Sequence, residues 1–292
     1  MISEGTKLMN LIIALQAKNH GSFPTPLYDE GYVLEGIETK FNITDKEGDS
    51  REVVPELQLK SDKENNLLFV ECKAGSVEKD QLERYKLISQ EAIKEGKITS
   101  LDSGKDINFD LMYLGPEEKK DKLIQSIEKD ENHYPIVIRG GNKLKLYLND
   151  KGNNKFRSPT LNKVFEEIEI KNAPISYVPF TTDDKIEFVM LAILREIYTF
   201  INGEEFTVEQ LIKAIFKERY GCISPQYISR LKTAVNKTLK KMREKHLNDY
   251  LFVNNNKWTI AAKTPKSFIT ACEKIKEEME DRKYMAPLSR WT

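Results

Sequence analysis

The sequence predicts an α/β protein in two parts, a mixed-sheet domain followed by an α-rich domain. Strand-like and helix-like patterns alternate up to about residue 148, whereas helical periodicity dominates from residue 185 onward. The charge is also segregated, because residues 183–292 carry 20 Lys/Arg against 15 Asp/Glu, a net charge of +5. The whole chain of 292 residues has 46 of each, so the preceding part carries −5. Such asymmetry indicates two modules with different tasks.

The first part begins with an amphipathic helix at residues 4–18, where leucine and isoleucine recur at helical spacing. Three strand-like runs separated by turn-like segments follow and predict two consecutive hairpins. These runs are residues 32–44, 51–60 and 66–73. Helices and strands then alternate over residues 77–95, 107–114, 117–129, 135–139, 143–148 and 161–168. This order predicts helices packed around one mixed sheet.

The boundary between the two parts is predicted where proline and threonine interrupt the strand and helix periodicities of the apolar residues. Residues 172–184 hold Pro174, Pro179 and two threonines. The second part then has helical patterns at 185–201, 207–220, 224–245 and 265–282, with a hairpin at 251–260. We therefore expect one domain at residues 1–172, a linker at 173–184 and a second domain at 185–292.

Composition limits the class of protein. No apolar run approaches the roughly 18–20 residues that a membrane-spanning helix needs. The three cysteines, Cys72, Cys222 and Cys272, are too far apart for a disulfide framework or a zinc site. The sequence therefore predicts a cytoplasmic protein without a membrane partner. The zero net charge excludes a uniformly basic nucleic-acid binder, whereas the charge segregation leaves a two-part binder open.

The second of the two hairpins carries the strongest chemical signal. If its turn is centred between Lys63 and Glu64, Glu56 faces Glu71 across the strands. Alternation then gathers two carboxylates and the Lys73 ammonium on one face. The opposite face is apolar and consists of Leu57, Leu59, Leu68, Val70 and Cys72.

Paired carboxylates beside an ammonium suit a particular chemistry. Two adjacent carboxylates repel each other unless a cation lies between them. A hard divalent ion such as Mg²⁺ suits these ligands, and it acidifies a bound water. A nearby lysine can orient that water or stabilise charge on a phosphate. The pattern therefore favours hydrolysis of a phosphodiester.

Pro55-Glu56 followed by Glu71-Cys72-Lys73 resembles the signature of the PD-(D/E)XK nuclease superfamily. The core of that superfamily runs helix, three antiparallel strands, helix, strand, which is the order predicted above. The resemblance implies a restriction-endonuclease-like core in which Glu56 and Glu71 bind Mg²⁺, with Mn²⁺ as a substitute. It also implies the Cys72 backbone carbonyl as a third ligand and Lys73 as a catalytic residue.

A second element resembles the RecB-like branch of this superfamily. Gln81 and Tyr85 match its Q-x-x-x-Y motif, and a spacing of four places them on one helix face. The resemblance implies that both belong to the catalytic set and face the scissile phosphate. The superfamily often adds another acid near the start of the domain. Glu4, Glu30 and Glu35 are the candidates, and the sequence does not choose among them.

A plainer interpretation of the same residues is a solvated, charged sheet face. Glu-x-Lys pairs are common on exposed strands, so the short motif alone does not decide between the two. Leu67 and Phe69 also fall on the charged face in the predicted register. An active site therefore requires a helix that covers these two side chains.

The second part resembles a winged-helix domain, because a helix–turn–helix pattern is followed by a hairpin. Thr207 is placed to cap one helix, and Ser224-Pro225 to begin the next. The helix that begins at Ser224-Pro225 has an apolar stripe and an otherwise strongly basic surface, and residues 254–257 would form the wing tip. Its predicted apolar stripe consists of Ile228, Leu231, Val235, Leu239 and Met242. The candidate nucleic-acid contacts are Gln226, Tyr227, Arg230, Lys237, Lys241 and Lys257. The alternative is a basic helix that packs on the first domain or on a partner protein.

The function expected from these features is that of a Mg²⁺-dependent deoxyribonuclease. The enzyme would hydrolyse DNA phosphodiesters as an endonuclease or exonuclease, in phage defence, restriction or a mobile element. Its partners would be DNA and other subunits of such a complex. One alternative is a catalytically silent subunit that binds nucleic acid or a partner protein. Another is a regulator that uses only the winged helix.

Overall fold

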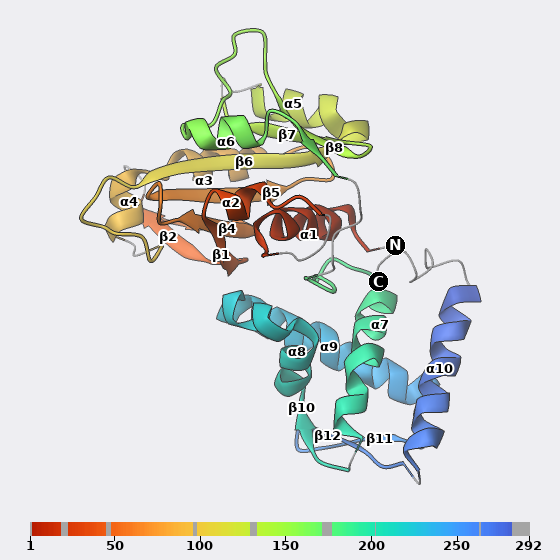
Figure 1. The fold of residues 1–292 in the computed structure, drawn as a ribbon. Coiled ribbons are helices and arrows are strands. Elements are labelled where there is room, and N and C mark those ends of the chain that lie inside the picture. The colour runs from red at the N-terminus through yellow and green to blue at the C-terminus, as the bar shows by residue number, and fades with distance from the viewer. Residues whose placement is uncertain are drawn as a thin grey trace. The chain divides into compact units, whose positions relative to one another are not determined.

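The structure is a computed structural model of two compact units, each described by itself (Figure 1). The sheet unit comprises residues 7–174 and 222–224, and the helical unit comprises residues 1–6, 175–221 and 225–292. Three predicted features lie outside the described residues. They are the helix ends at residues 129 and 282 and residues 173–176 of the linker. The structure describes residues 2–18, 23–44, 48–95, 98–128, 133–170, 177–201, 203–262 and 264–281.

A mixed seven-stranded sheet forms the centre of the sheet unit, in the order β1-β4-β5-β6-β7-β8-β9. The first three strands are antiparallel neighbours, whereas β6 runs parallel to β5 and β7 parallel to β6. A parallel pair needs a crossover, and two helices lie in the β5–β6 connection. The strands are β1 (Tyr32–Ile37), β4 (Leu57–Ser61), β5 (Asn66–Cys72), β6 (Asn108–Pro116), β7 (Ile136–Gly140), β8 (Lys143–Tyr147) and β9 (Ile168–Glu169).

Helices and a small hairpin surround this sheet. One face of the sheet packs on a core that includes Leu82 and Tyr85 from α3 and Leu123 from α5. Phe41, from the hairpin of β2 (Phe41–Thr44) and β3 (Ser50–Val53), belongs to the same core. The helices are α1 (Glu4–Gln16), α2 (Pro26–Asp29), α3 (Lys79–Lys86), α4 (Gln90–Glu95), α5 (Lys120–Glu128) and α6 (Pro159–Val164), with a short 3-10 helix η1 (Glu117–Lys119). The prediction of a mixed α/β fold is therefore confirmed.

Two predicted strands are each broken in the structure. The run at 32–44 divides into β1 and β2 (Phe41–Thr44) at Glu38, whose φ is +51°. The run at 51–60 divides into β3 (Ser50–Val53) and β4 around Pro55, which lacks the N–H that a continuous ladder requires. As a result β2 and β3 form a separate two-stranded sheet.

Two predicted helices also differ. The helix expected at 77–95 divides into α3 and α4, and the Ser89 hydroxyl accepts the Ala92 N–H at the start of α4. The helix expected at 161–168 ends at Val164, and Ile168 enters β9. Both departures come from caps and tertiary pairing, which apolar periodicity does not register.

The helical unit contains four helices among its described residues and a three-stranded sheet in the order β10-β12-β11. Short 3-10 segments follow two of the helices. The elements are α7 (Ile186–Glu196), η2 (Ile197–Phe200), β10 (Phe206–Thr207), α8 (Val208–Phe216), η3 (Lys217–Cys222), α9 (Pro225–Lys245), β11 (Leu251–Asn254), β12 (Lys257–Ile260) and α10 (Pro265–Asp281). The predicted hairpin at 251–260 is confirmed, whereas β10 was not predicted.

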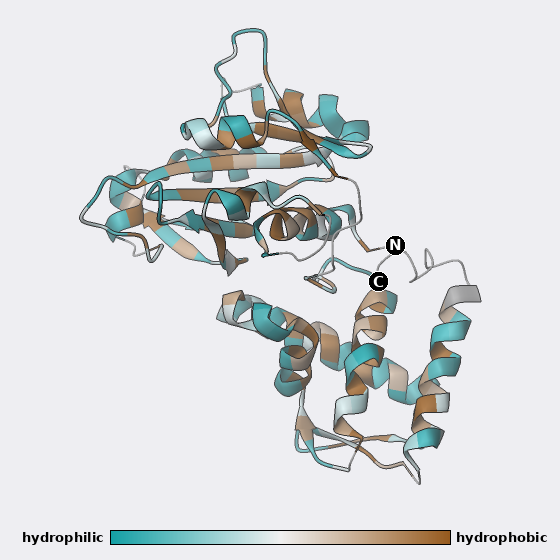
Figure 2. Ribbon diagram, viewed as in Figure 1, coloured by the Kyte–Doolittle hydropathy of each residue, from teal (hydrophilic) through white to brown (hydrophobic). Residues whose placement is uncertain are grey.

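Local chemistry explains the helical unit's main turns. Thr207 and Gln210 form a capping box at the start of α8, as the sequence predicts for Thr207. Asn255 and Asn256 have φ values of +48° and +62°, the geometry that favours asparagine in a two-residue hairpin. Figure 2 shows apolar residues concentrated on α7 and alternating with polar ones along α10. None of the helices within the described residues is long and apolar enough to cross a membrane.

Candidate active site

The five predicted catalytic residues lie together at one end of the central strands. Glu71 and Lys73 stand at the end of β5, Glu56 immediately precedes β4, and α3 supplies Gln81 and Tyr85. Lys73 Nζ lies 2.7 Å from Glu71 Oε2 and 3.9 Å from Glu56 Oε1. A single ammonium therefore lies within reach of both carboxylates.

The predicted strand register accounts for this convergence. Leu57 pairs with Val70 and Leu59 with Leu68 in the antiparallel ladder of β4 and β5. This pairing is the register that a turn between Lys63 and Glu64 requires, so that prediction is confirmed. Glu56 and Glu71 are thereby brought to the same end of the sheet.

Glu71 is the most constrained group of the site. Its side chain is only 1% exposed. Oε1 accepts a hydrogen bond from the Tyr85 hydroxyl, and Oε2 accepts one from Gln81 Nε2 at 2.7 Å in addition to the Lys73 contact. Three donors therefore compensate the burial of this charge. Burial and the neighbouring Glu71 raise the pKa of Tyr85 well above its usual value, so its hydroxyl stays protonated and donates.

Glu56 is partly buried, with 23% of its side chain exposed. Its Oε2 accepts the Cys72 backbone N–H at 2.9 Å, and its own backbone carbonyl accepts the Glu38 N–H at 3.0 Å. Burial, followed by repulsion from Glu71, raises the pKa of Glu56 to about 8. Nearby positive charge opposes this shift, so the position favours a bound cation.

Lys73 supplies that positive charge. Its partial burial would lower its pKa, but the attraction of Glu71 and Glu56 outweighs burial and raises the pKa overall. The side chain is 18% exposed and remains an ammonium at neutral pH. Lys73 is therefore the member of the site that meets solvent while contacting both acids.

The donor set fits a hard divalent cation. Two carboxylates that both contact one ammonium offer oxygen ligands of the type Mg²⁺ prefers, and Mg²⁺ commonly retains several waters. Among the described residues, no group of three or more His, Cys, Asp or Glu side chains is arranged to hold a metal. A metal at this position would therefore depend on Glu56, Glu71, water and backbone oxygen such as that of Cys72.

Cys72 itself offers no nucleophile. Its side chain is buried, and burial together with the charges of Glu56 and Glu71 raises the pKa of the thiol well above its usual value. The thiol is therefore protonated at neutral pH, and a thiolate is the reactive form of cysteine. The predicted role of Cys72 involves only its backbone carbonyl.

The expected charged face of the hairpin is in fact covered. Every residue of β5 is buried, including Leu67 and Phe69. Both belong to the core with Leu82 of α3, and the Phe69 ring stacks on Phe41 with 5.5 Å between centroids. A solvated sheet face is therefore contradicted, and the predicted helical cover is confirmed.

None of the three acids suggested for the front of the domain joins this cluster through a described contact. Glu35 accepts hydrogen bonds from Gln58, Thr99 and Ser100, which attach residues 98–100 to β1. Glu30 pairs with Lys63 at 3.0 Å. Glu4 lies in the first turn of α1, in a segment that belongs to the helical unit.

Two residues near the site were not predicted. The charge of Glu38 contributes to the raised pKa of Glu56, and no sequence signal marks Glu38 because the strand was predicted to continue through it. Tyr113 pairs with Glu71 across β5 and β6. Its hydroxyl is buried without a hydrogen-bond partner among the described residues. Only the parallel register, which the sequence does not specify, brings Tyr113 beside Glu71.

The predicted nucleic-acid contacts separate into three groups. Gln226, Arg230 and Lys237 are exposed on α9. Lys241 and Lys257 form ion pairs with acidic residues of the helical unit, at 3.7 Å and 2.9 Å. Tyr227 needs correction, because it is 1% exposed and its hydroxyl accepts a backbone N–H at 3.3 Å. Tyr227 lies four residues before Leu231, so both belong to the buried stripe of α9. The stripe therefore begins at Tyr227 and not, as the sequence predicts, at Ile228.

The fold and site define an α/β protein with a buried carboxylate–lysine cluster at the end of a mixed sheet. Residues 4–180, which include this cluster, match the MJECL32 domain family, and the chain belongs to that family. It is similar to a Methanocaldococcus jannaschii protein named uncharacterized protein MJECL32, with 28% identity over 178 residues. The match covers 56% of this chain and 37% of that relative, so the chain spans little more than a third of the relative's length. No solved structure matches this chain.

Proposed function

We propose that this protein is a metal-dependent nuclease of the PD-(D/E)XK type that hydrolyses DNA phosphodiester bonds. The observation that carries the proposal is the contact of Lys73 with both Glu56 and Glu71 at the end of β5. Gln81 and Tyr85 reach the same carboxylate from α3. The order of three antiparallel strands, helices and a parallel strand also agrees with the core of that superfamily.

The side chains have distinct roles in this proposal. Glu56 and Glu71 would hold Mg²⁺ or Mn²⁺ together with the Cys72 carbonyl, and such an ion supplies a Lewis acid and an acidified water. Lys73 meets solvent and can orient a water or neutralise a phosphate oxygen. Gln81 and Tyr85 are positioning residues, because they fix the Glu71 carboxylate by hydrogen bonds.

The helical unit is proposed to be a winged-helix domain that contacts DNA. Helix α9 follows α8 in a helix–turn–helix order, and the β11–β12 hairpin corresponds to the wing. Gln226, Arg230 and Lys237 are exposed along α9, and Lys257 lies at the hairpin tip. Exposed cations of this kind bind phosphates and position a protein on the duplex.

The test is a cleavage assay of the whole chain on plasmid and single-stranded DNA with Mg²⁺ or Mn²⁺. Lys73→Ala is compared with Lys63→Ala, which removes an exposed lysine from the turn of the same hairpin. The proposal predicts cleavage by the unchanged protein and by Lys63→Ala, and none by Lys73→Ala. Equal cleavage by all three proteins would show that this cluster does not catalyse the reaction.

The second candidate function is a catalytically silent subunit of a defence, restriction or transposition complex. It is favoured by one observation, namely that the Glu71 carboxylate is buried and already bonded to three donors. This function predicts DNA binding without cleavage under any divalent ion. Divalent cations would then leave the melting temperature of the protein unchanged.

A further inference from the structure

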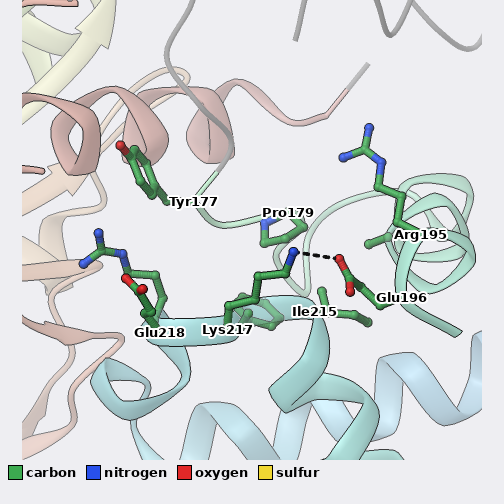
Figure 3. A pocket seen from close by; sticks show the side chains of 10 residues that line it. Tyr177, Pro179, Arg195, Glu196, Ile215, Lys217 and Glu218 are labelled. Atoms are coloured by element: carbon green, nitrogen blue, oxygen red, sulfur yellow. Dashed lines mark ion pairs between the residues drawn. The ribbon is translucent and has the colours of Figure 1, made fainter. Parts of the chain in front are cut away.

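The helical unit contains a cavity of about 390 Å³ whose lining mixes acidic and basic residues (Figure 3). Lys217 pairs with Glu196 at 3.1 Å, and the Arg219 guanidinium covers the Tyr177 ring, 5.0 Å from its centroid. Figure 3 shows the Arg195 guanidinium directed away from the cavity. Small-molecule sites commonly present a few convergent polar groups, whereas the polar groups of this lining are paired with one another. The sheet unit, by contrast, holds a buried polar group without a described partner.

The hydroxyl of Tyr113 in β6 is that group. The Tyr113 side chain is fully buried, and its hydroxyl has no hydrogen-bond partner among the described residues. Buried tyrosine hydroxyls usually have a partner, so an orphaned one requires an explanation. Burial, and then the charge of Glu71, raises the pKa of Tyr113, so the hydroxyl keeps its proton at neutral pH. A buried donor therefore lies within the field of the Glu71 carboxylate without bonding to it.

The parallel strand register keeps Tyr113 beside the candidate active site. Tyr113 pairs with Glu71 across β5 and β6, so the two side chains lie on the same face of the sheet. Tyr113 also belongs to the core that contains Tyr85, whose hydroxyl donates to Glu71 Oε1. A carboxylate oxygen can accept two hydrogen bonds, and Tyr85 is the donor that the described residues supply to this oxygen. An unused donor therefore lies beside an acceptor with remaining capacity.

Lys73 occupies the position that a cation shared by both carboxylates would need. Its ammonium lies 2.7 Å from Glu71 Oε2 and 3.9 Å from Glu56 Oε1. Like charges repel, so Lys73 would have to leave Glu71 for a divalent cation to be held there. Its side chain is already 18% exposed and can turn toward solvent. Glu71 would then lose one of its three donors, although a ligating carboxylate needs hydrogen bonds that fix its orientation.

We propose that Tyr113 is a positioning residue of this site, whose hydroxyl donates to the Glu71 carboxylate when Glu71 holds a divalent cation in place of the Lys73 ammonium. The inference rests on the proposed function, because it requires Glu71 to be a cation ligand. Without a divalent cation, Lys73 compensates the charge of Glu71 and the Tyr113 hydroxyl contributes nothing to stability. With the cation, the hydroxyl keeps the carboxylate oriented.

The test is isothermal titration of the full chain with Mn²⁺, with thermal unfolding in EDTA as a second readout. Tyr113→Phe deletes only the hydroxyl and should weaken Mn²⁺ binding about 10–100-fold, as loss of an outer-shell partner commonly does. Its melting temperature in EDTA should stay unchanged or rise, because the variant removes a buried donor without a described partner. Tyr147→Phe is the matched control, since Tyr147 lies in the same row of the sheet beyond Ile136, and it should change neither value.

Three results would count against this role. Equal Mn²⁺ affinity of Tyr113→Phe and the unchanged protein would overturn the inference and leave the proposed nuclease intact. Absence of Mn²⁺ binding by the unchanged protein would overturn the inference together with the metal site of the proposed function. A lower melting temperature of Tyr113→Phe in EDTA would show that the hydroxyl has a partner without the cation, so its role would be structural.

Discussion

Glu71 shows how a buried charge is maintained at the scale of a single residue. Its carboxylate is almost inaccessible, and Lys73, Gln81 and Tyr85 supply all the donors that the structure describes around it. A buried acceptor that loses a donor bears an uncompensated desolvation cost. The geometry of the site should therefore be coupled to the stability of the sheet unit.

Tyr85→Phe tests this coupling, since it deletes only the hydroxyl that bonds to Glu71. We expect the free energy of unfolding to fall by about 1–3 kcal/mol. Tyr28→Phe is the matched control, because Tyr28 is exposed, and it should change stability by less than about 0.5 kcal/mol. Urea unfolding at neutral pH measures both variants. Equal midpoints would contradict the described network.

At the scale of residues, the sequence predicts which side chains share a strand face, but it does not predict every buried position or every tertiary neighbour. The convergence of Glu56, Glu71 and Lys73 follows from strand alternation and a two-strand register, both readable from residue types. The burial of Tyr227 depends on which of two adjacent apolar positions faces the core, and the sequence favoured Ile228. Glu38 joins the site through the bend that ends β1, and Tyr113 joins it through a parallel strand pairing. Neighbouring residues in the sequence encode neither feature.

At the scale of elements, the main difference from the predictions is that two predicted strands are each divided into two. Apolar periodicity locates most helices and strands, but it does not reveal that Glu38 and Pro55 divide two long runs. Nor does it reveal the short strands β9 and β10, which are set by pairing with distant strands. Tertiary contacts, rather than local preference, decide these places.

Asp110 of β6 links a loop to the sheet and should respond to pH. Its carboxylate accepts the backbone N–H groups of Arg157 and Ser158, and burial raises its pKa. A raised folded-state pKa means that the folded protein holds the proton more tightly. The free energy of unfolding should then fall as the pH rises from below about 3.9, the unfolded-state value, toward the folded one.

The Asp110→Asn variant has no carboxyl group at this position, so its free energy of unfolding should fall less as the pH rises. The free energy of unfolding of both proteins is measured in urea at several values between about pH 3 and pH 7. The unchanged protein should lose stability relative to the variant as the pH rises. Parallel curves would show that Asp110 has the same affinity for its proton in both states.

The turn at the end of α8 offers a test of backbone strain. Lys217→Gly should raise the free energy of unfolding by up to about 1 kcal/mol, because glycine adopts a positive φ without a steric penalty. The ion pair that it loses is exposed and worth less than about 1 kcal/mol. Ala214→Gly, inside the same helix, should instead cost about 0.5–1 kcal/mol. If Lys217→Gly lowered the free energy of unfolding more than Ala214→Gly, the turn at Lys217 would not be strained.

At the scale of the whole molecule, the proposal assigns DNA cleavage to the sheet unit and DNA binding to the helical unit. The acidic cluster belongs to the sheet unit, whereas the exposed cations of α9 belong to the helical unit. The opposite charges of the two parts, apparent from composition, agree with such a division. The proposal therefore requires that DNA affinity and DNA cleavage respond to different substitutions.

Lys237→Ala examines the binding half of this claim. Because Lys237 is exposed on α9, its loss should weaken affinity for duplex DNA of any sequence. The slope of log affinity against log salt should also fall by about 1 if this lysine contacts a phosphate. Lys274→Ala, an exposed position on α10, is the control. Fluorescence anisotropy with labelled duplex provides both numbers, and identical slopes would remove α9 from the DNA interface.

The most direct measurement of the central claim is the rate of plasmid cleavage by Lys73→Ala in Mg²⁺. We predict at least about a hundredfold loss relative to the unchanged protein, since a group that stabilises charge at a reacting phosphate contributes on that scale. Lys63→Ala should retain the full rate, and duplex binding by Lys73→Ala should be intact. Cleavage by Lys73→Ala at the unchanged rate would contradict the proposed active site.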